Sequence, residues 1–215
     1  MHKLLKGSVL AALVFVAACD VSSTTSSVSP NLKPSLSGGG GDGGGSTITL
    51  LTALPGTSIS TPNSFWAVQG QDRTGELVYN DPNSGNTARK FLRLRIRPRT
   101  QIARPNGTLL APGDSILITI SLSDSVNLIA HFEPSGVRFS GKDPALLTMY
   151  FGETDHDLNH DGVVNAIDAA IVQTFSIFHQ AFTGAPWTRV ASTVNTGADE
   201  VVAAIPGFSN YVIAY

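Results

Sequence analysis

Apolar and polar residues alternate along much of the chain after residue 47, with the period expected of half-buried β-strands. The clearest alternation sets three apolar residues against three basic ones: Leu92, Leu94 and Ile96 against Arg93, Arg95 and Arg97. A second run, residues 116–122, is bounded by Pro112-Gly113 and Asp124, which favour turns. Both patterns predict strands with one buried face and one solvated face.

Further strands are expected at short intervals along the chain. The stronger candidates are residues 128–132, 146–150, 187–194, 201–205 and 211–215, and the weaker ones are 48–53, 65–69 and 76–79. Clusters of turn-forming residues separate them at 80–85, 105–107 and 134–136. Many short strands at this spacing predict a mainly β fold, and we expect an antiparallel β-sandwich over residues 47–215.

One stretch departs from the alternating pattern. Its members recur at the i, i+3, i+4 spacing of an amphipathic helix: Ile167, Ala170, Ile171, Thr174, Phe175 and Phe178. This spacing predicts a helix over residues 166–180, which ends before Gly184 and Pro186.

An acidic loop precedes this helix and carries the most specific chemical signal of the chain. Calcium takes six to eight oxygen ligands, and an EF-hand loop supplies them from positions 1, 3, 5, 7, 9 and 12. In the register that starts at residue 157, these positions hold Asp157, Asn159, Asp161, Val163, Asn165 and Asp168. Gly162 stands at position 6, where the backbone must turn sharply, and Val164 at position 8 is expected to point inward. The sequence therefore predicts a calcium site.

The same run, Asp-x-Asn-x-Asp-Gly-x-Val-Asn-x-x-Asp, resembles the loop of bacterial dockerins, the calcium modules of cellulosome assembly. The resemblance covers residues 157–180, the loop and the helix after it, and implies calcium binding. Dockerins carry two such loops, whereas this chain has one, so cohesin binding is not implied. Because residues 146–150 read as a strand, we expect a strand–loop–helix unit that holds an ion statically.

Two alternatives compete with calcium at this loop. Asp, Asn and Gly are common turn residues, and Asn165 with Asp168 could form a capping box without any metal. A transition metal could instead use His156 and His160, with His179 downstream. Against the metal-free reading, the acids between residues 153 and 168 have no Lys or Arg nearby in the sequence and would repel one another without a counter-ion.

The N-terminus reads as an export signal. Lys3 and Lys6 precede an apolar run over residues 7–18, which is too short to span a bilayer. Its end, Val-Ala-Ala followed by Cys19, resembles the lipobox of bacterial lipoproteins, which implies cleavage before Cys19 and acylation of that residue. The alternative is an ordinary signal peptide with an incidental cysteine. We expect a signal peptide over residues 1–18 and a protein anchored by lipid to the inner or outer membrane of the bacterial envelope.

Residues 19–46 then form a Ser- and Gly-rich segment that cannot bury enough apolar surface to fold. We expect it to be a disordered tether between the lipidated Cys19 and the sandwich.

Two weaker features each have an ordinary structural explanation. A basic strip over residues 89–104 could bind an anionic lipid or polysaccharide, or could pair internally with the acidic loop. We favour a third interpretation, in which the strip is the solvent-exposed face of an edge strand. Four aromatic residues could stack on sugars, although aromatic residues in strands more often belong to the core: Trp66, Tyr79, Tyr150 and Trp187.

A second resemblance concerns the fold alone. Residues 132–139, 144–150 and 208–211 resemble scattered parts of the β-sandwich domain shared by zonula-occludens proteins and netrin receptors. The resemblance implies a sandwich and provides no catalytic residue.

Composition narrows the classes of function. Lys and Arg number 14 against 16 Asp and Glu, which gives no basic excess for nucleic acid. A single cysteine excludes a disulfide framework and a cysteine-rich zinc site. No Gly-x-Ser-x-Gly, His-Glu-x-x-His or phosphate-loop motif is present. We therefore expect a non-enzymatic module that binds calcium and acts in binding or in structure, with a polysaccharide or protein partner in the envelope. The alternative is a polysaccharide-active enzyme or its accessory carbohydrate-binding domain.

The first prediction concerns the anchor. In a bacterial host, Cys19→Ser should leave the precursor uncleaved or release the protein from membranes, because the substitution removes the acylated thiol. Membrane fractionation and the mass of the mature N-terminus measure both effects. A variant that fractionates and migrates like wild type contradicts the lipoprotein interpretation.

Overall fold

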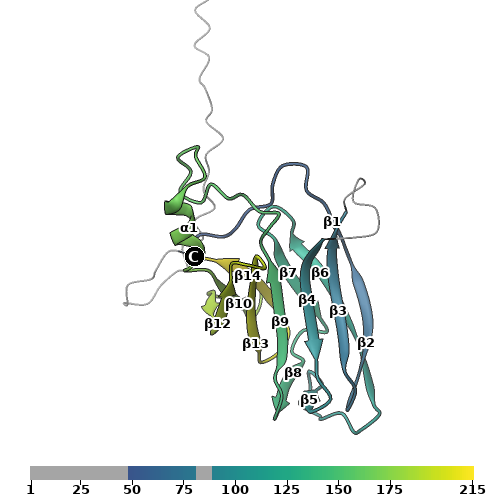
Figure 1. Cartoon of the computed structure of the whole chain (residues 1–215). Helices are drawn as coiled ribbons and strands as arrows, with labels where there is room; N and C mark the ends of the chain where they lie inside the picture. The colour runs from purple at the N-terminus through teal and green to yellow at the C-terminus, as the bar shows by residue number, and fades with distance from the viewer. Residues whose placement is uncertain (1–47, 81–88) are drawn as a thin grey trace, which may run out of the picture. The chain divides into compact units, whose positions relative to one another are not determined.

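The fold is a β-sandwich with one short helix (Figure 1), as expected from the sequence. The computed structural model describes residues 48–80 and 89–215. The export signal, Cys19, the tether and most of the turn cluster at 80–85 lie outside the described residues. In the described part of the chain, no helix is long and apolar enough to cross a membrane.

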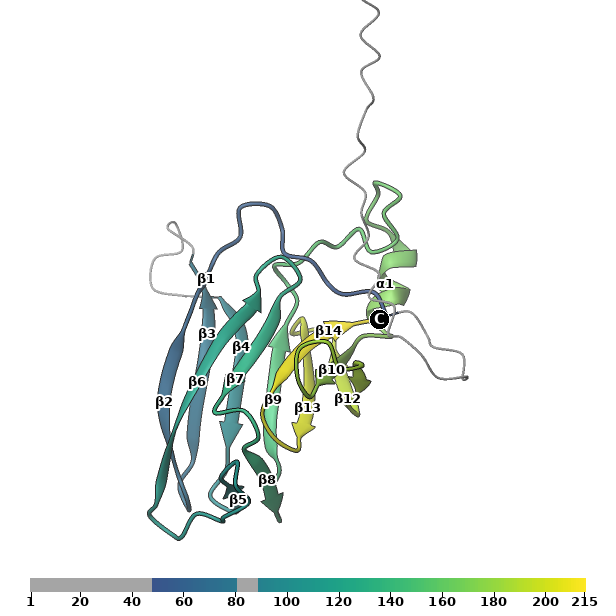
Figure 2. The ribbon, with the colours of Figure 1, turned by 180° about the vertical axis from the view of Figure 1, so that it is seen from behind.

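Two six-stranded antiparallel sheets form the two layers, which Figures 1 and 2 show from opposite sides. The first sheet has the order β1 (Ile59–Ser60), β3 (Arg73–Tyr79), β4 (Lys90–Ile96), β9 (Ala145–Tyr150), β13 (Glu200–Ile205) and β12 (Ser192–Asn195). The second has the order β11 (Thr188–Arg189), β10 (Ser176–Gln180), β14 (Asn210–Ala214), β7 (Ile129–Glu133), β6 (Ser115–Asp124) and β2 (Asn63–Val68). A separate ribbon pairs β5 (Thr100–Ala103) with β8 (Arg138–Gly141).

The core lies between the sheets and is built from the alternating positions. On β4, Leu92 and Leu94 are 0% exposed, whereas Arg95 on the opposite face of the strand is exposed. Leu94 pairs with Leu147 of β9 in the next strand. The sheets approach closely where Gly75 of β3 faces the ring of Phe65 on β2, since a side chain at Gly75 would collide with that ring. The alternation in the sequence therefore identified the buried face correctly.

The helix is shorter than predicted. α1 spans Ala166–Val172, with Gln173 as its C-cap, so the prediction of a helix to residue 180 was wrong. Residues 176–180 form β10, which pairs with β14 on one side and β11 on the other. Phe178 belongs to a small second core on the outer face of this sheet, together with Leu50 and Val212. Because β10 is buried on both faces, its apolar run resembles a continuation of the helix.

Three other expectations need correction. Residues 48–53 form isolated bridges, Leu50 to Ala214 and Ala53 to Thr154, and no strand. The stretch 187–194 divides into β11 and β12, which belong to different sheets. The basic strand β4 is not an edge strand, because it lies between β3 and β9.

Strands β1, β5 and β8 were missed because they are short or lack alternation.

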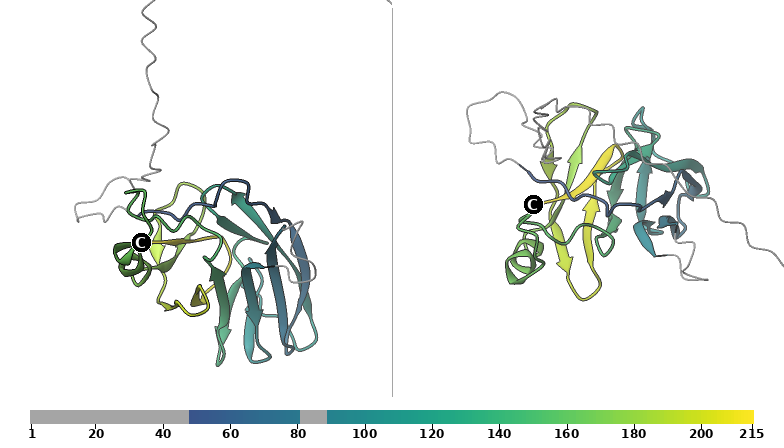
Figure 3. Two further views of the ribbon diagram at one scale, coloured as in Figure 1. Left: turned by 45° about the horizontal axis from the view of Figure 1, so that its top comes forward. Right: turned by 90° about the horizontal axis from the view of Figure 1, so that it is seen from above.

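The two ends of the sandwich carry different connections. The register pairs Tyr150 with Glu200 at one end of β9, and Ala145 with Ile205 at the other. The acidic loop and α1 follow Tyr150, and the C-terminal strand β14 ends beside them, as seen from above in Figure 3. The turn between β13 and β14 lies at the opposite end, which separates these two regions of the surface.

The second prediction tests the core. Leu94→Ala should lower the free energy of unfolding by about 2–5 kcal/mol, because it removes a fully buried side chain and leaves a cavity between the sheets. Leu117→Ala is the matched control: its side chain is 43% exposed on the outer face of β6, so the cost should stay within about 0.5 kcal/mol. Chemical denaturation of both variants measures the difference, and equal losses would contradict the assignment of the buried face.

Candidate metal centre

The acidic loop is fixed to the end of the sandwich at three points. The amide of Asp155 donates to the carbonyl of Thr52 at 3.0 Å. The side chain of Leu158 is 6% exposed and belongs to the main core. The hydroxyl of Tyr215 donates to the Leu158 carbonyl at 2.7 Å. The contacts of Tyr215, Thr52 and the core with the loop therefore determine where it lies.

Asp168 connects the loop to α1 through hydrogen bonds of its carboxylate. Its Oδ1 accepts from the amides of Leu158 at 2.8 Å and Asn159 at 3.2 Å, and its Oδ2 accepts from the amide of Asn165 at 2.8 Å. The residue is 2% exposed. These bonds, that from Asn165 above all, hold the pKa of the Asp168 carboxyl below its ordinary value, so the group stays charged.

In the first half of the loop, side-chain oxygens accept hydrogen bonds from backbone amides. Asp157 accepts from the amides of Asp161 at 3.1 Å and Gly162 at 2.8 Å. Asp161 in turn accepts from the amide of Val163 at 2.8 Å, and the side-chain Oδ1 of Asn159 accepts from the Asp161 amide at 3.1 Å. Gly162 has φ = 87°, the left-handed conformation that the sixth position requires.

Asn165 closes the network as the N-cap of α1. Its side-chain oxygen accepts from the amide of Ile167 at 2.7 Å, and its side-chain amide donates to the Val163 carbonyl at 3.0 Å. The capping box between Asn165 and Asp168 is formed. All six residues predicted as calcium ligands therefore lie in one connected hydrogen-bonded loop, and the capping explanation accounts for two of them.

The donor chemistry of this loop suits a hard cation, because the six positions offer carboxylate, amide and carbonyl oxygens. A carboxylate oxygen that accepts one N–H retains a second acceptor site. Over residues 48–80 and 89–215, however, no group of three or more His, Cys, Asp or Glu side chains stands in an arrangement that could hold a metal ion. Calcium at this loop thus stays a prediction.

Val164 does not point inward, contrary to expectation. Its side chain is 64% exposed, and those of Val163 and Ile167 are 59% and 58% exposed. The apolar side chain that anchors the loop is Leu158 instead. The physical reason is that the core under the loop already receives Leu158, so the residues on the far side of the turn at Gly162 face solvent.

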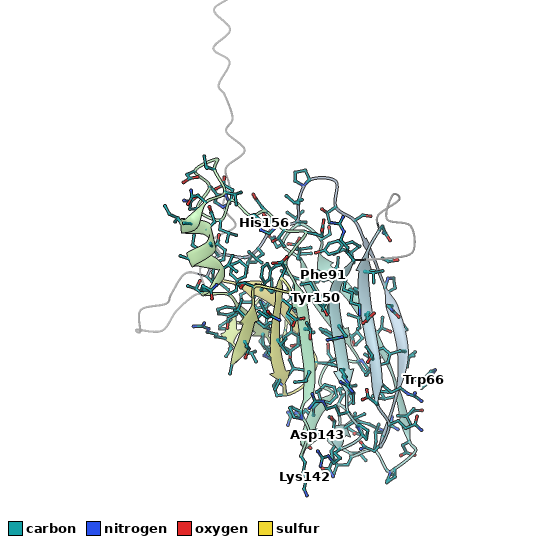
Figure 4. All side chains as sticks on the ribbon, in the orientation of Figure 1. Trp66, Phe91, Lys142, Asp143, Tyr150 and His156 are labelled. Atoms are coloured by element: carbon teal, nitrogen blue, oxygen red, sulfur yellow. The ribbon has the colours of Figure 1, made fainter. Side chains whose placement is uncertain are left out.

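The three histidines considered as transition-metal ligands occupy different environments. His160 is exposed with φ = 58°, as expected for the rim of the loop. His156 is half-buried where the loop meets the ends of the strands (Figure 4), and it lines a cavity of about 300 Å³ together with Asp168 and Asp199. His179 lies on β10 and bonds to Ser209, outside the loop.

The basic strip of residues 89–104 is largely paired with acids of the same domain. Lys90 contacts Glu76 at 2.7 Å, Arg95 contacts Asp72 at 2.5 Å, and Arg99 contacts Asp143 at 2.9 Å. Arg89 pairs with Glu153, shortly before the acidic loop. Internal pairing therefore explains most of the strip, although only the Arg89 pair lies near the loop.

The four aromatic candidates divide between core and surface. Tyr79 is 5% exposed and belongs to the core, while Tyr150 and Trp187 are half-buried. Trp66 is 58% exposed and projects outward from β2 (Figure 4), directly across from Leu117 of β6. Trp66 is therefore the candidate that retains a surface for stacking.

Comparisons with protein-family models, with curated proteins and with solved structures found no match. The resemblance to dockerins therefore rests on the sequence of residues 157–180 alone.

The third prediction concerns Asp168 without any metal. The pKa of its carboxyl lies below the ordinary 3.8 in the folded state, so the charged group stabilises the fold above that value and the contribution is lost as pH falls through the lower, folded-state pKa. In EGTA, Asp168→Asn should have a lower melting temperature than wild type at pH 7. Below about pH 4, the melting temperature of this variant should fall less steeply with decreasing pH than that of wild type. The matched control is Asp114→Asn, which alters an exposed contact to the Ala111 amide. Equal melting curves for Asp168→Asn and wild type from pH 3 to pH 7 would contradict the role of Asp168.

Proposed function

We propose that the protein is a lipid-anchored module of the bacterial cell envelope whose β-sandwich is stabilised by one calcium ion at the acidic loop, and that it acts as a binding or structural component. One observation carries the calcium part of the proposal: the six candidate ligands lie in a single hydrogen-bonded loop that Leu158 and Tyr215 attach to the sandwich. The lipid anchor rests on the sequence that ends in Cys19. The three carboxylates would neutralise the ion, and the remaining oxygens would complete its shell.

The connections of the loop favour a static clamp over a switch. Asp168 is held by three backbone amides, and α1 continues directly into β10 of the sandwich. A sensor EF-hand exposes a groove by rotating one helix against another. In this unit a strand takes the place of the entering helix, so calcium should raise stability without rearranging the fold.

The alternative is a carbohydrate-binding accessory domain, and Trp66 is the observation that favours it. Its ring is exposed on the outer face of the second sheet next to Leu117, and the hydroxyls of Ser64 and Thr119 contact each other at 2.8 Å beside them. Exposed aromatic rings flanked by polar groups suit sugar rings, which are apolar on their faces and polar at their edges. Loss of polysaccharide retention in Trp66→Ala with an unchanged melting temperature would support this alternative.

The fourth prediction tests calcium. Titration calorimetry on the full-length protein should detect one site, with a dissociation constant of about 10⁻⁴–10⁻³ M because a lone loop lacks a preorganising partner. Calcium at ten times that constant should add about 1.4 kcal/mol to the free energy of unfolding. Asp157→Ala should abolish the calcium-dependent rise in melting temperature, and the matched control His156→Ala should retain it.

Two outcomes would contradict the assignment. The first is the absence of any heat of binding with calcium. The second is a preference for zinc that His156→Ala removes. A large change in far-ultraviolet circular dichroism on adding calcium would instead contradict the static clamp.

A further inference from the structure

A serine and a histidine meet at the end of the sandwich opposite the acidic loop. The hydroxyl of Ser209 lies 2.6 Å from Nε2 of His179, although 30 residues separate them in the sequence. The pairing of β10 with β14 sets this contact: His179 pairs with Tyr211, and Ser209, two residues before Tyr211, lies diagonally across from His179 on the same face. The amide of Phe132 donates to the Ser209 carbonyl at 3.0 Å and fixes the serine backbone.

This pair lines a cavity. The cavity has a volume of about 280 Å³, and Gly136, Arg138 and Pro206 form other parts of its wall. Ser209 is 3% exposed, so its hydroxyl lies at the floor, while Arg138 is exposed at the wall. Among the described residues that line it there is no Asp or Glu, so the one formal charge at the cavity is the positive charge of Arg138. The volume corresponds to a small ligand.

The environment of His179 suits a neutral imidazole that accepts a proton. Burial lowers its pKa below the ordinary value, so the ring is uncharged at neutral pH. The ring of Tyr211 packs against it with centroids 4.9 Å apart and restricts its orientation. A neutral Nε2 within hydrogen-bonding distance of a serine hydroxyl is the arrangement that activates a nucleophile.

We propose that Ser209 and His179 form a nucleophile–base pair that hydrolyses a small ester bearing a carboxylate, with Arg138 binding the carboxylate. The Ser209 oxygen forms a bond to the ester carbonyl carbon while Nε2 of His179 takes the hydroxyl proton. The bond from that carbon to the leaving oxygen then breaks, and the alcohol departs with the proton from His179. Water attacks the acyl-serine, His179 takes the proton of the water, and the acid is released as Ser209 regains its hydrogen.

This activity is independent of the calcium site, because the two regions lie at opposite ends of β9 and share no residue. No sequence motif indicated the Ser209–His179 pair, for a structural reason. Ser209 lies in a turn between strands without the Gly-x-Ser-x-Gly pattern, and only the register of β10 and β14 brings it to His179.

The fifth prediction uses a fluorophosphonate probe on the full-length protein in calcium-containing buffer. Wild type should take up one phosphonyl group per chain, and peptide mapping should place it on Ser209. Labelling should cease in Ser209→Ala and slow about 100-fold or more in His179→Gln, as expected when a general base is lost. The matched control is Ser123→Ala, whose hydroxyl contacts the Ile129 carbonyl and no histidine; it should label like wild type.

The second arm tests Arg138 by hydrolysis. Wild type should cleave the 4-nitrophenyl monoester of succinate with a higher kcat/KM than 4-nitrophenyl acetate, and Arg138→Gln should lower the value for succinate about tenfold while leaving acetate unchanged. Absence of label on wild type, or label mapped to a residue other than Ser209, would overturn the proposal even if Ser209→Ala fails to fold. Equal kcat/KM values for the two esters in wild type would overturn the role of Arg138.

Discussion

The structure depends on one constraint, which is that each of two sheets must bury one of its faces against the other. Strands β4, β9 and β13 on one side and β14, β7 and β6 on the other direct their apolar side chains into a common core, with Leu94, Leu147 and Phe132 fully buried. Because the strands are antiparallel, every connection falls at one of two ends. The acidic loop and the Ser209–His179 pair occupy these two ends, and neither interrupts the core.

The C-terminal strand β14 relates the two regions. Its start follows Ser209, its residue Tyr211 packs on His179, and the chain ends at Tyr215, whose hydroxyl holds the acidic loop. Burial and the neighbouring carboxylates raise the pKa of Tyr215, so the hydroxyl keeps its proton and donates to the loop. A single strand buried on both faces thus supports a candidate metal centre at one end and a candidate nucleophile at the other.

The loop illustrates how a hydrogen-bonded turn and a metal site can share one sequence. The carboxylates of Asp157, Asp161 and Asp168 accept from six backbone amides of the loop, so hydrogen bonds explain much of its fold without an ion. These amides belong to residues 158, 159, 161, 162, 163 and 165. The same carboxylates concentrate negative charge, and this charge is the physical reason to expect a cation. Titration with calcium therefore measures a property that the hydrogen bonds alone do not determine.

The sequence alone determined the sandwich, the buried face of β4 and the positions of the loop and N-cap, because alternation, capping and turn chemistry act over a few residues. It misjudged residues 173–180, since an apolar run buried on both faces has no period that separates strand from helix. It also placed Val164 inward, whereas the core had room for Leu158. Only the tertiary structure decided that Ser209 meets His179, because strand register joins residues that local rules treat separately.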